Sequence, residues 1–540
     1  MKNILWTYLR RLGLSAMLAL SLSLIAGADV QVCAQSSPFW GNLKPGPYAV
    51  GFKTIRTYDY SRAIKPKVER DGKVNAQRDQ RAMPMLISIW YPAVKNPTGV
   101  PMTFEQCLYA SQEVDAAALT AEQKQEISRN WKDFYERPFN FPYGKIADES
   151  WQQLLKTKAA AVPNAQAARG SFPLILGEGD ASAAFTLDEF LASHGYVVAR
   201  VKGRAASTPL LYAEGAVRNL EYALGLLHDQ PGVDPNRLGI IGMSAAGFPI
   251  YLLPMRNTEV DAAVVMDSII FVPSIASSLK ATPYFDLTKF RAPLLYMDRA
   301  ESVKSADFAD FDAIRYATRY HFLLNYEPLL HQDYSQHGAS VTHVLKLRGK
   351  DQAAAEQAFE LIYQYVLHFF DAHVKKEPAG LAFLNRKPEE NGARPGFLTF
   401  EAKAALPAPP SEAEFMTLLQ QPNGVSQAVT VYHEATRADP SLRLFQEGMV
   451  NGLGFQFLQS HRIQDAIEVF KLNVEAYPNS IQALNTLGNA YRDSGQKQLA
   501  IQCFEKVLEM IAQDTQMNAS EKAQSKNNIQ QKINQLKEQK

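Results

Sequence analysis

The chain has 540 residues, of which 46% are hydrophobic and 21% are charged, and this is the balance of a folded protein with more than one domain. Lysine and arginine number 56 against 55 aspartates and glutamates, so the net charge of +1 provides no general basic field that would attract nucleic acid. The composition excludes a disordered or collagen-like chain, and we expect no nucleic-acid partner.

The first residues have the pattern of an export signal. Arg10 and Arg11 precede an apolar run at 12–28, which is shorter than the roughly 20 residues that a membrane-crossing helix needs. Small residues follow this run, and we expect cleavage after Ala34, so that residues 1–34 form a signal peptide. The mature chain is then predicted to be periplasmic or extracellular, with no transmembrane span.

Two alternating apolar segments, 48–58 and 85–91, predict antiparallel edge strands. The stretch 101–170 that follows is polar and helix-rich, and it carries aromatic residues such as Trp131 and Phe134. It interrupts the sheet pattern. We expect a helical insertion that either packs on the rim of the sheet or caps its pocket as a lid.

Strand and helix patterns alternate between residues 171 and 245. Apolar runs predict strands at 172–176, 196–201 and 238–243, and helices are predicted between them at 184–193 and 212–228. This βαβαβ order predicts a mostly parallel sheet with helices on both faces, which binds ligands at the carboxyl ends of its strands. With further strands at 262–266 and 293–297, the sheet is predicted to be about eight strands wide.

After residue 383 the composition shifts, and the proline- and charge-rich segment 384–410 is predicted to be a linker. A 34-residue pattern then occurs at about 447–480 and again at about 481–514. Its shared positions are glycine, aromatic, alanine and phenylalanine: Gly454, Phe457, Ala466 and Phe470 recur as Gly488, Tyr491, Ala500 and Phe504.

The period and the residue types resemble the tetratricopeptide repeat, in which small residues let paired helices approach closely. Ala428 and Tyr432 indicate a degenerate earlier copy. We expect an all-α repeat domain over 411–540. It either binds a protein or peptide partner, or it only packs on the first domain or on a second copy of the chain.

Ser244 lies between a predicted strand and a helix, within the segment IIGMSAAG at 240–247. Gly242 and Ala246, two residues before and after it, are both small, as a nucleophile elbow requires. Such a sharp turn exposes the serine hydroxyl at the start of a helix, so Ser244 is predicted to be a nucleophile. The alternative is an ordinary serine N-cap on a buried turn.

A serine nucleophile needs a histidine base oriented by a carboxylate, and in this kind of sheet the order along the chain is Ser, then Asp or Glu, then His. His331 follows the last predicted strand on a loop that can return over the strand ends, and it is the predicted base. His337 and His343 are nearby alternatives.

Two positions can supply the carboxylate. Asp267 ends the strand at 262–266, while Asp298 and Glu301 follow the strand at 293–297. Both strand ends face the predicted site, so the order alone leaves the choice open.

Five segments together resemble the platelet-activating-factor acetylhydrolase group, which lies beside the dienelactone hydrolases within the α/β-hydrolases. They are GPYAVG at 46–51, ISIWYP at 87–92, LASHGYVV at 191–198, the segment around Ser244, and HQDY at 331–334. The resemblance spans about residues 44–375, and it implies an α/β-hydrolase fold for the domain at 35–383. It also implies hydrolysis of esters, typically with short acyl groups, without a metal.

In that group the acid of the triad follows the strand directly after the nucleophile helix, which implies Asp267 rather than Asp298. The same resemblance places the oxyanion hole at the backbone N–H groups of Ala245 and Asp180. The chain departs from the group at 177–179, where Gly-Glu-Gly stands instead of Ser-His-Gly. Glu178 thus puts an acidic residue beside the oxyanion site.

These observations predict an exported carboxylesterase or lipase-like hydrolase that acts on short-acyl or phospholipid-type esters through an acyl-enzyme. Its substrate would be a small-molecule or lipid ester. We expect no cofactor, because the sequence contains no HExxH, CxxC or GxxxxGK[ST] motif. Glu178 and Ala246 motivate one alternative, a catalytically inactive hydrolase fold that serves as a binding protein or scaffold. A serine peptidase on the same fold is another.

Overall fold

The computed structural model describes residues 36–62, 82–94, 99–112, 114–137, 142, 144–203, 208–440 and 442–538. The predicted signal peptide lies outside the described residues. The chain divides into two compact units, one that ends at Ala405 and one that begins at Leu406. Within the described ranges, no helix is both long enough and apolar enough to cross a membrane.

The first unit is built around a ten-stranded sheet with the order β10-β9-β8-β7-β6-β4-β5-β2-β1-β3. The strands are β1 (Ala49–Asp59), β2 (Met83–Ala93), β3 (Ala161–Pro163), β4 (Phe172–Glu178), β5 (Val197–Lys202), β6 (Val233–Met243), β7 (Val260–Met266), β8 (Leu294–Arg299), β9 (Arg319–Leu324) and β10 (Leu398–Lys403). The six strands β4, β5, β6, β7, β8 and β9 run parallel to one another. Strand β2 pairs with β5, and β10 pairs with β9, in antiparallel orientation.

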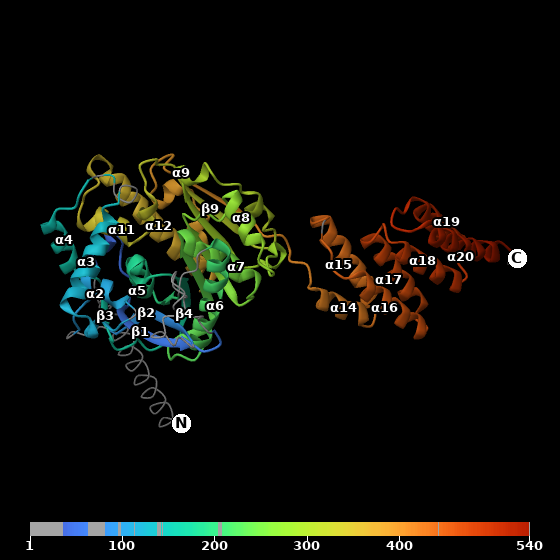
Figure 1. Ribbon diagram of the computed structural model, residues 1–540, viewed down its shortest axis with the longest axis horizontal. Helices are drawn as coiled ribbons and strands as arrows, with labels where there is room; N and C mark the ends of the chain where they lie inside the picture. Colours follow the sequence, from blue (N-terminus) through green and yellow to red (C-terminus); the bar gives the residue numbers. More distant parts are fainter. Residues whose placement is uncertain are drawn as a thin grey trace, which may run out of the picture. The chain divides into compact units, whose positions relative to one another are not determined.

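Helices cover both faces of this sheet, because its central strands are apolar on both sides; all seven residues of β4 are buried. Figure 1 shows α5, α11 and α12 on one side of the strands and α6, α7 and α8 on the other. The helices of this unit are α2 (Phe104–Ala110), α3 (Ala121–Tyr135), α4 (Asp148–Lys156), α5 (Phe185–Ser193), α6 (Pro209–His228), α7 (Gly247–Leu252), α8 (Pro273–Lys280), α9 (Ala300–Val303), α10 (Ala309–Ala313), α11 (Gln336–Ala339), α12 (Gln352–His373) and α13 (Pro378–Leu384).

The predicted fold class is confirmed. The strand order, with β4 and β5 exchanged relative to the chain and helices on both faces, is that of an α/β-hydrolase fold. The predicted βαβαβ core is present as β4, α5, β5, α6 and β6, and the segments predicted as antiparallel edge strands form β1 and β2. The sheet has ten strands rather than about eight, because β3, β9 and β10 were not predicted.

The segment 384–410 is not simply a linker. It contains β10, which pairs with β9 along its whole length, so the first unit continues to about residue 403 rather than ending at 383. The pairing has an apolar basis, because Leu398 is buried and the ring of Phe400 stacks on that of Tyr320 at 5.8 Å. Proline, glycine and charged residues just before this strand conceal its apolar positions in the sequence.

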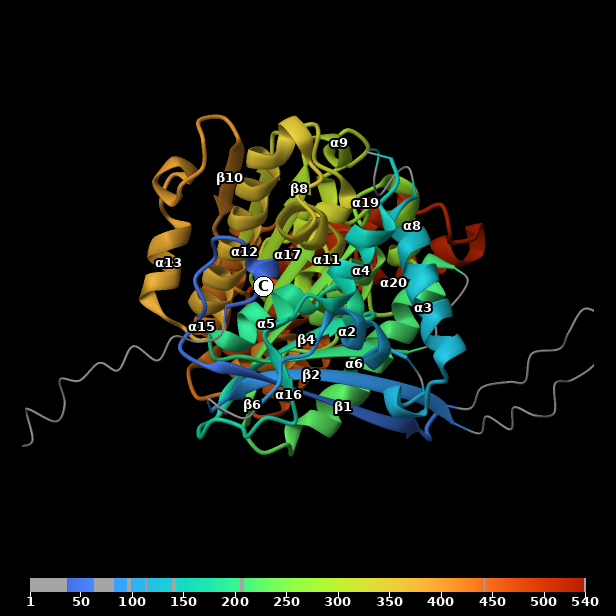
Figure 2. The same cartoon turned by 90° about the vertical axis from the view of Figure 1, so that its left-hand side faces the viewer.

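The insertion 101–170 is helical, as predicted. Figure 2 shows its helices α2, α3 and α4 on the same side of the sheet as α5. Its anchor is Tyr135 at the end of α3. That side chain is 1% exposed, and its hydroxyl lies 3.2 Å from Ser340 Oγ. The insertion is therefore packed into the core of the unit at this point.

The second unit is all helical: α14 (Glu412–Gln420), α15 (Gly424–Ala438), α16 (Glu447–Gln459), α17 (Ile463–Ala476), α18 (Ile481–Asp493), α19 (Lys497–Gln513) and α20 (Ala519–Glu538). Glycine lets the paired helices approach. A Cβ on Gly454 would lie 2.4 Å from the ring of Phe470, and one on Gly488 would lie 2.7 Å from the ring of Phe504. The degenerate copy predicted from Ala428 and Tyr432 corresponds to α15, where both side chains are buried.

Candidate active site

Ser244 occupies a sharp turn between β6 and α7. Its φ is +57°, a left-handed conformation that is rare for residues other than glycine and is found where a turn is held under strain. The turn also requires a small residue at Gly242, because a Cβ there would lie 2.2 Å from the carbonyl oxygen of Ala246. The backbone therefore has the shape that the sequence predicts for a nucleophile elbow.

His331 and Asp267 lie in contact at the carboxyl ends of the strands. His331 is on the short helix η7 (His331–Tyr334) after β9, and its Nδ1 lies 2.6 Å from Oδ2 of Asp267, which follows β7. Because an ionised carboxylate only accepts hydrogen bonds, the ring donates through Nδ1 and keeps Nε2 as the basic nitrogen. His331 and Ser244 line the same pocket.

Asp267 is 3% exposed and is held by three donors. Besides His331, Arg299 Nε donates to Oδ2 at 2.9 Å, and Ser302 Oγ lies 2.7 Å from Oδ1. Burial alone would raise the pKa of this carboxyl, but the bonds from these donors and the charges of His331 and Arg299 bring it below its ordinary value. The group is thus held in its charged form.

Asp298, the second candidate for the acid, has other hydrogen-bond partners than His331. Asp298 is fully buried, shares the hydroxyl of Ser302 with Asp267, and has its other oxygen 3.9 Å from Nε2 of His321. Within the described residues, no hydrogen bond or ion pair joins Asp298 to His331. Glu301 is exposed and pairs with Lys304.

The alternative bases are also separated from Asp267 by their surroundings. His337 is buried, with its ring 4.3 Å from that of Tyr135 and its Nε2 3.3 Å from the Tyr135 carbonyl oxygen. His343 packs its ring against Phe359 at 4.4 Å. Burial lowers the pKa of each histidine to about 4, so both remain neutral parts of the core at physiological pH.

The two residues predicted for the oxyanion hole, Asp180 and Ala245, lie close to Ser244 in different ways. Asp180 lines the same pocket as Ser244, and Ala245 follows the serine on the short helix η4 (Ser244–Ala246). The Asp180 carboxylate is turned to other partners, since it accepts from Ser182 N at 2.9 Å and pairs with Lys202 at 2.7 Å.

Glu178 ends β4 directly before this turn, and its side chain is 8% exposed. The hydroxyl of Tyr212, on α6, donates to its carboxyl. Burial raises the pKa of Glu178 to about 7, although the Tyr212 hydroxyl and the charge of Arg200 both act in the opposite direction. The acidic residue that breaks the expected Ser-His-Gly pattern is therefore close to half ionised at neutral pH.

The pocket that contains Ser244 and His331 has a volume of about 240 Å³. Most of its other lining is apolar, and the insertion contributes Phe134 from α3. The apolar and aromatic lining residues are Phe134, Ala183, Ala184, Leu187, Met243, Ala246, Met266, Tyr334 and Tyr363. A pocket of this size accommodates a short acyl group.

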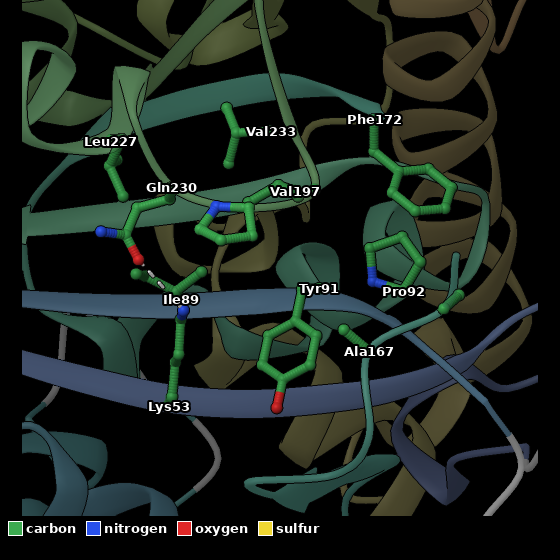
Figure 3. Close-up of a pocket in the computed structure, with 13 residues that line it drawn as sticks. Lys53, Ile89, Tyr91, Pro92, Ala167, Phe172, Val197, Leu227, Gln230 and Val233 are labelled. Carbon is green, nitrogen blue, oxygen red and sulfur yellow. Dashed lines mark hydrogen bonds between the residues drawn. The ribbon is translucent and has the colours of Figure 1, made fainter. Parts of the chain in front are cut away.

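A second pocket, of about 140 Å³, is shown in Figure 3. Phe172, Val197 and Val233, the first residues of β4, β5 and β6, line it, so it lies at the strand ends opposite to Ser244. Lys53 reaches into it, with its Nζ 3.5 Å from Gln230 Oε1. It holds none of the predicted site residues.

Arg299 and Ser302 were not predicted as site residues. They follow Asp298 at the end of β8 and reach across to Asp267 on the neighbouring strand β7. The one sequence feature that could have pointed to them is their position at the carboxyl end of the strand next to the candidate acid. Among the described residues, no cluster of three or more histidines, cysteines or carboxylates could hold a metal ion.

Comparison with known proteins supports the repeats directly. The model of the family described as "Tetratricopeptide repeat" matches residues 481–514. The second unit carries a tetratricopeptide repeat. No curated protein matches the chain. Among solved structures, a ferulic acid esterase from Streptomyces cinnamoneus is similar, with 18% sequence identity, 65% of this chain and 96% of that chain covered, and a TM-score of 0.43.

Proposed function

We propose that the first unit is a serine ester hydrolase with Ser244 as nucleophile, His331 as base and Asp267 as the orienting acid. The observation that carries this proposal is the 2.6 Å contact between His331 Nδ1 and Asp267, at the pocket that His331 shares with the strained turn of Ser244. The motifs at 46–51, 87–92, 191–198 and 331–334 favour the platelet-activating-factor acetylhydrolase and dienelactone hydrolase-like group.

In this mechanism Ser244 Oγ attacks the ester carbonyl while Nε2 of His331 takes the hydroxyl proton. The backbone N–H groups of Ala245 and Asp180 hold the negative oxygen of the tetrahedral intermediate. The intermediate collapses, the leaving alkoxide takes the proton from His331, and an acyl-enzyme remains. Water then repeats the sequence and releases the acid, and Asp267 stabilises the imidazolium in both halves.

The decisive variant is Ser244→Ala. We expect hydrolysis of p-nitrophenyl esters from acetyl to octanoyl by the wild type, and a fall in kcat of about 10⁴-fold or more in the variant, because the nucleophile is lost. The matched control is Ser277→Ala on the exposed face of α8, which should keep wild-type rates. The pocket volume leads us to expect the highest kcat/KM for short acyl chains.

Two further assays separate the alternatives. A fluorophosphonate should label the wild type and not Ser244→Ala; an unlabelled wild type without esterase activity would instead favour an inactive binding protein. Turnover of p-nitroanilides faster than of matched esters would favour a peptidase.

We also propose that the mature chain is exported, on the basis of the basic and apolar pattern of residues 1–34 in the sequence, and that its repeats bind a protein or peptide partner. N-terminal sequencing of the protein recovered from the periplasm or medium should begin at Gln35. A full-length chain retained in the cytoplasm would contradict export.

A further inference from the structure

Glu178 lies at the same edge of the sheet as Ser244. In the parallel pairing of β4 with β6, Gly177 is opposite Ile241, so Glu178 and Ser244 both leave their strands at the carboxyl end. Glu178 lines the pocket together with Ser244 and His331. The residue is nevertheless buried, with 8% of its surface exposed, so little water is available to screen its charge.

The other charged groups around the pocket are compensated. Arg200 of β5 binds Asp188 of α5 through Nε at 3.0 Å and through Nη2 at 2.7 Å, and Asp188 is fully buried. Lys202 of β5 pairs with Asp180 at 2.7 Å.

The candidate acid Asp267 is likewise bound by His331 and by Arg299. Glu178 differs from these carboxylates because its hydrogen-bond partner, the Tyr212 hydroxyl on α6, carries no charge. When Glu178 ionises, the pocket therefore gains a negative charge that no bonded cation offsets.

We propose that Glu178 is a selectivity residue of this site, which admits uncharged esters as a carboxylic acid and, as a carboxylate, slows them and rejects acyl groups that carry negative charge. This inference rests on the proposed hydrolase function and names its substrate class. The physical reason is that a carboxylate beside the oxyanion turn opposes the negative charge that develops on the carbonyl oxygen. A carboxylate on the substrate meets the same repulsion before any chemistry begins.

Both forms are accessible near neutral pH, because burial raises the pKa of Glu178 to about 7. The Tyr212 hydroxyl stabilises the carboxylate and so lowers this pKa. Removing that hydroxyl should therefore raise the pKa of Glu178 further. Two substitutions thus change the same group in different ways, one by deleting its titration and the other by moving it.

The first test is the pH dependence of kcat/KM for p-nitrophenyl butyrate, measured from about pH 5.5 to about 9 on the full chain. For the wild type we expect a decline of about tenfold with a midpoint near pH 7. Glu178→Gln, which has the same shape and keeps a partner for Tyr212, should show no such decline. Tyr212→Phe should move the decline to higher pH.

A decline of the same size and midpoint in Glu178→Gln would overturn the inference. If that variant does not fold, as judged by circular dichroism, the direction of the shift in Tyr212→Phe decides. A midpoint that is unchanged or lower in Tyr212→Phe would also overturn it.

The second test compares p-nitrophenyl hexanoate with the p-nitrophenyl half ester of adipic acid, which has the same chain length and adds a terminal carboxylate. At about pH 8 we expect the wild type to prefer the uncharged ester about tenfold more strongly than Glu178→Gln does. An equal preference in both proteins would contradict the inference. A wild type that hydrolyses no ester at any pH would instead refute the proposed function, and this result is distinct from an active enzyme with a flat profile.

Discussion

Asp267 is held by hydrogen bonds on both of its carboxylate oxygens. It accepts hydrogen bonds from His331 and Arg299 on one oxygen and from Ser302 on the other, and these residues lie on η7, at the end of β8 and on α9. Because both oxygens are occupied, the carboxylate has little freedom to rotate, and the imidazole that it binds is fixed with it. The orientation of the His331 ring thus depends on Arg299 and Ser302, which do not line the pocket of Ser244.

Ser302 tests this dependence. We expect Ser302→Ala to lower kcat about tenfold with little change in KM, because the hydroxyl that Asp267 and Asp298 share is lost while the pocket lining stays intact. The measurement is steady-state kinetics with p-nitrophenyl butyrate. Ser305→Ala, an exposed serine one turn away, is the control. A raised KM with wild-type kcat would show that Ser302 serves the pocket instead.

At this scale the sequence allows part of the site to be predicted. The order along the chain limits the acid to Asp267 or to Asp298 and Glu301, and the family resemblance favours Asp267. The structure places Asp267 against His331, while the catalytic roles of these residues remain proposals. Arg299 and Ser302 could not be predicted as site residues, because they contact Asp267 across two neighbouring strands, β7 and β8. Spacing along one strand carries no information about which side chain of the next strand turns toward it.

The repeat helices, unlike Arg299 and Ser302, could be predicted from a local sequence pattern alone. Gly454 and Gly488 lie 34 residues apart and each faces a phenylalanine of the partner helix. Each repeat contacts mainly its neighbours, so the residues that pack against one another lie within about 34 residues along the chain. Their pattern can therefore be recognised in the sequence. Strand β10 was missed for the complementary reason, since its pairing partner β9 lies some 75 residues earlier and only that pairing makes it a strand.

Two glycines of α16 make a matched pair. Gly454→Ala should destabilise the repeat unit by about 2 kcal/mol, because the new methyl group meets the ring of Phe470. Gly452→Ala should stabilise it by about 0.5–1 kcal/mol, because nothing lies within 4 Å of the added Cβ and alanine favours the helix. Calorimetry of the full chain measures both. Equal effects of the two substitutions would contradict the close-packing role of Gly454.

Across the whole molecule, buried titratable groups of two kinds act on stability in opposite directions. Burial raises the pKa of Glu189 to about 8 and that of Glu178 to about 7. Burial also lowers the pKa of His337, His343 and His373 to about 4. Burial thus favours the neutral form of each of these groups in the folded first unit, whereas the unfolded chain ionises them at their ordinary values.

The stability of the first unit should therefore be greatest near pH 6.5. The contribution of the two carboxyls is complete below about pH 4.5 and is lost as pH rises through about 7 to 8. The contribution of the histidines is complete above about pH 6.5 and is lost as pH falls toward 4. We expect the unfolding temperature to fall by about 5 °C at pH 5 and at pH 8.5.

Tryptophan fluorescence makes this measurement specific, because all five tryptophans of the sequence precede residue 152 and the second unit has none. A stability that rises steadily from pH 5 to pH 8.5 would contradict the assignment of Glu178 and Glu189 as neutral buried acids. A stability that falls steadily over that range would contradict the assignment for the histidines.

The antiparallel pairing of β10 with β9 has a consequence for solubility. Strand β9 is largely apolar, and without β10 its row of backbone N–H and C=O groups would be open to another chain. Strand β10 carries exposed Glu401 and Lys403, charges that discourage further pairing at its outer side. A protease cut between residues 385 and 397 would leave Ser244, Asp267 and His331 in place but would break the covalent link that holds β10 beside β9. If β10 then left the sheet, the edge of β9 would be open to pairing with another chain, so we expect the cleaved protein to aggregate.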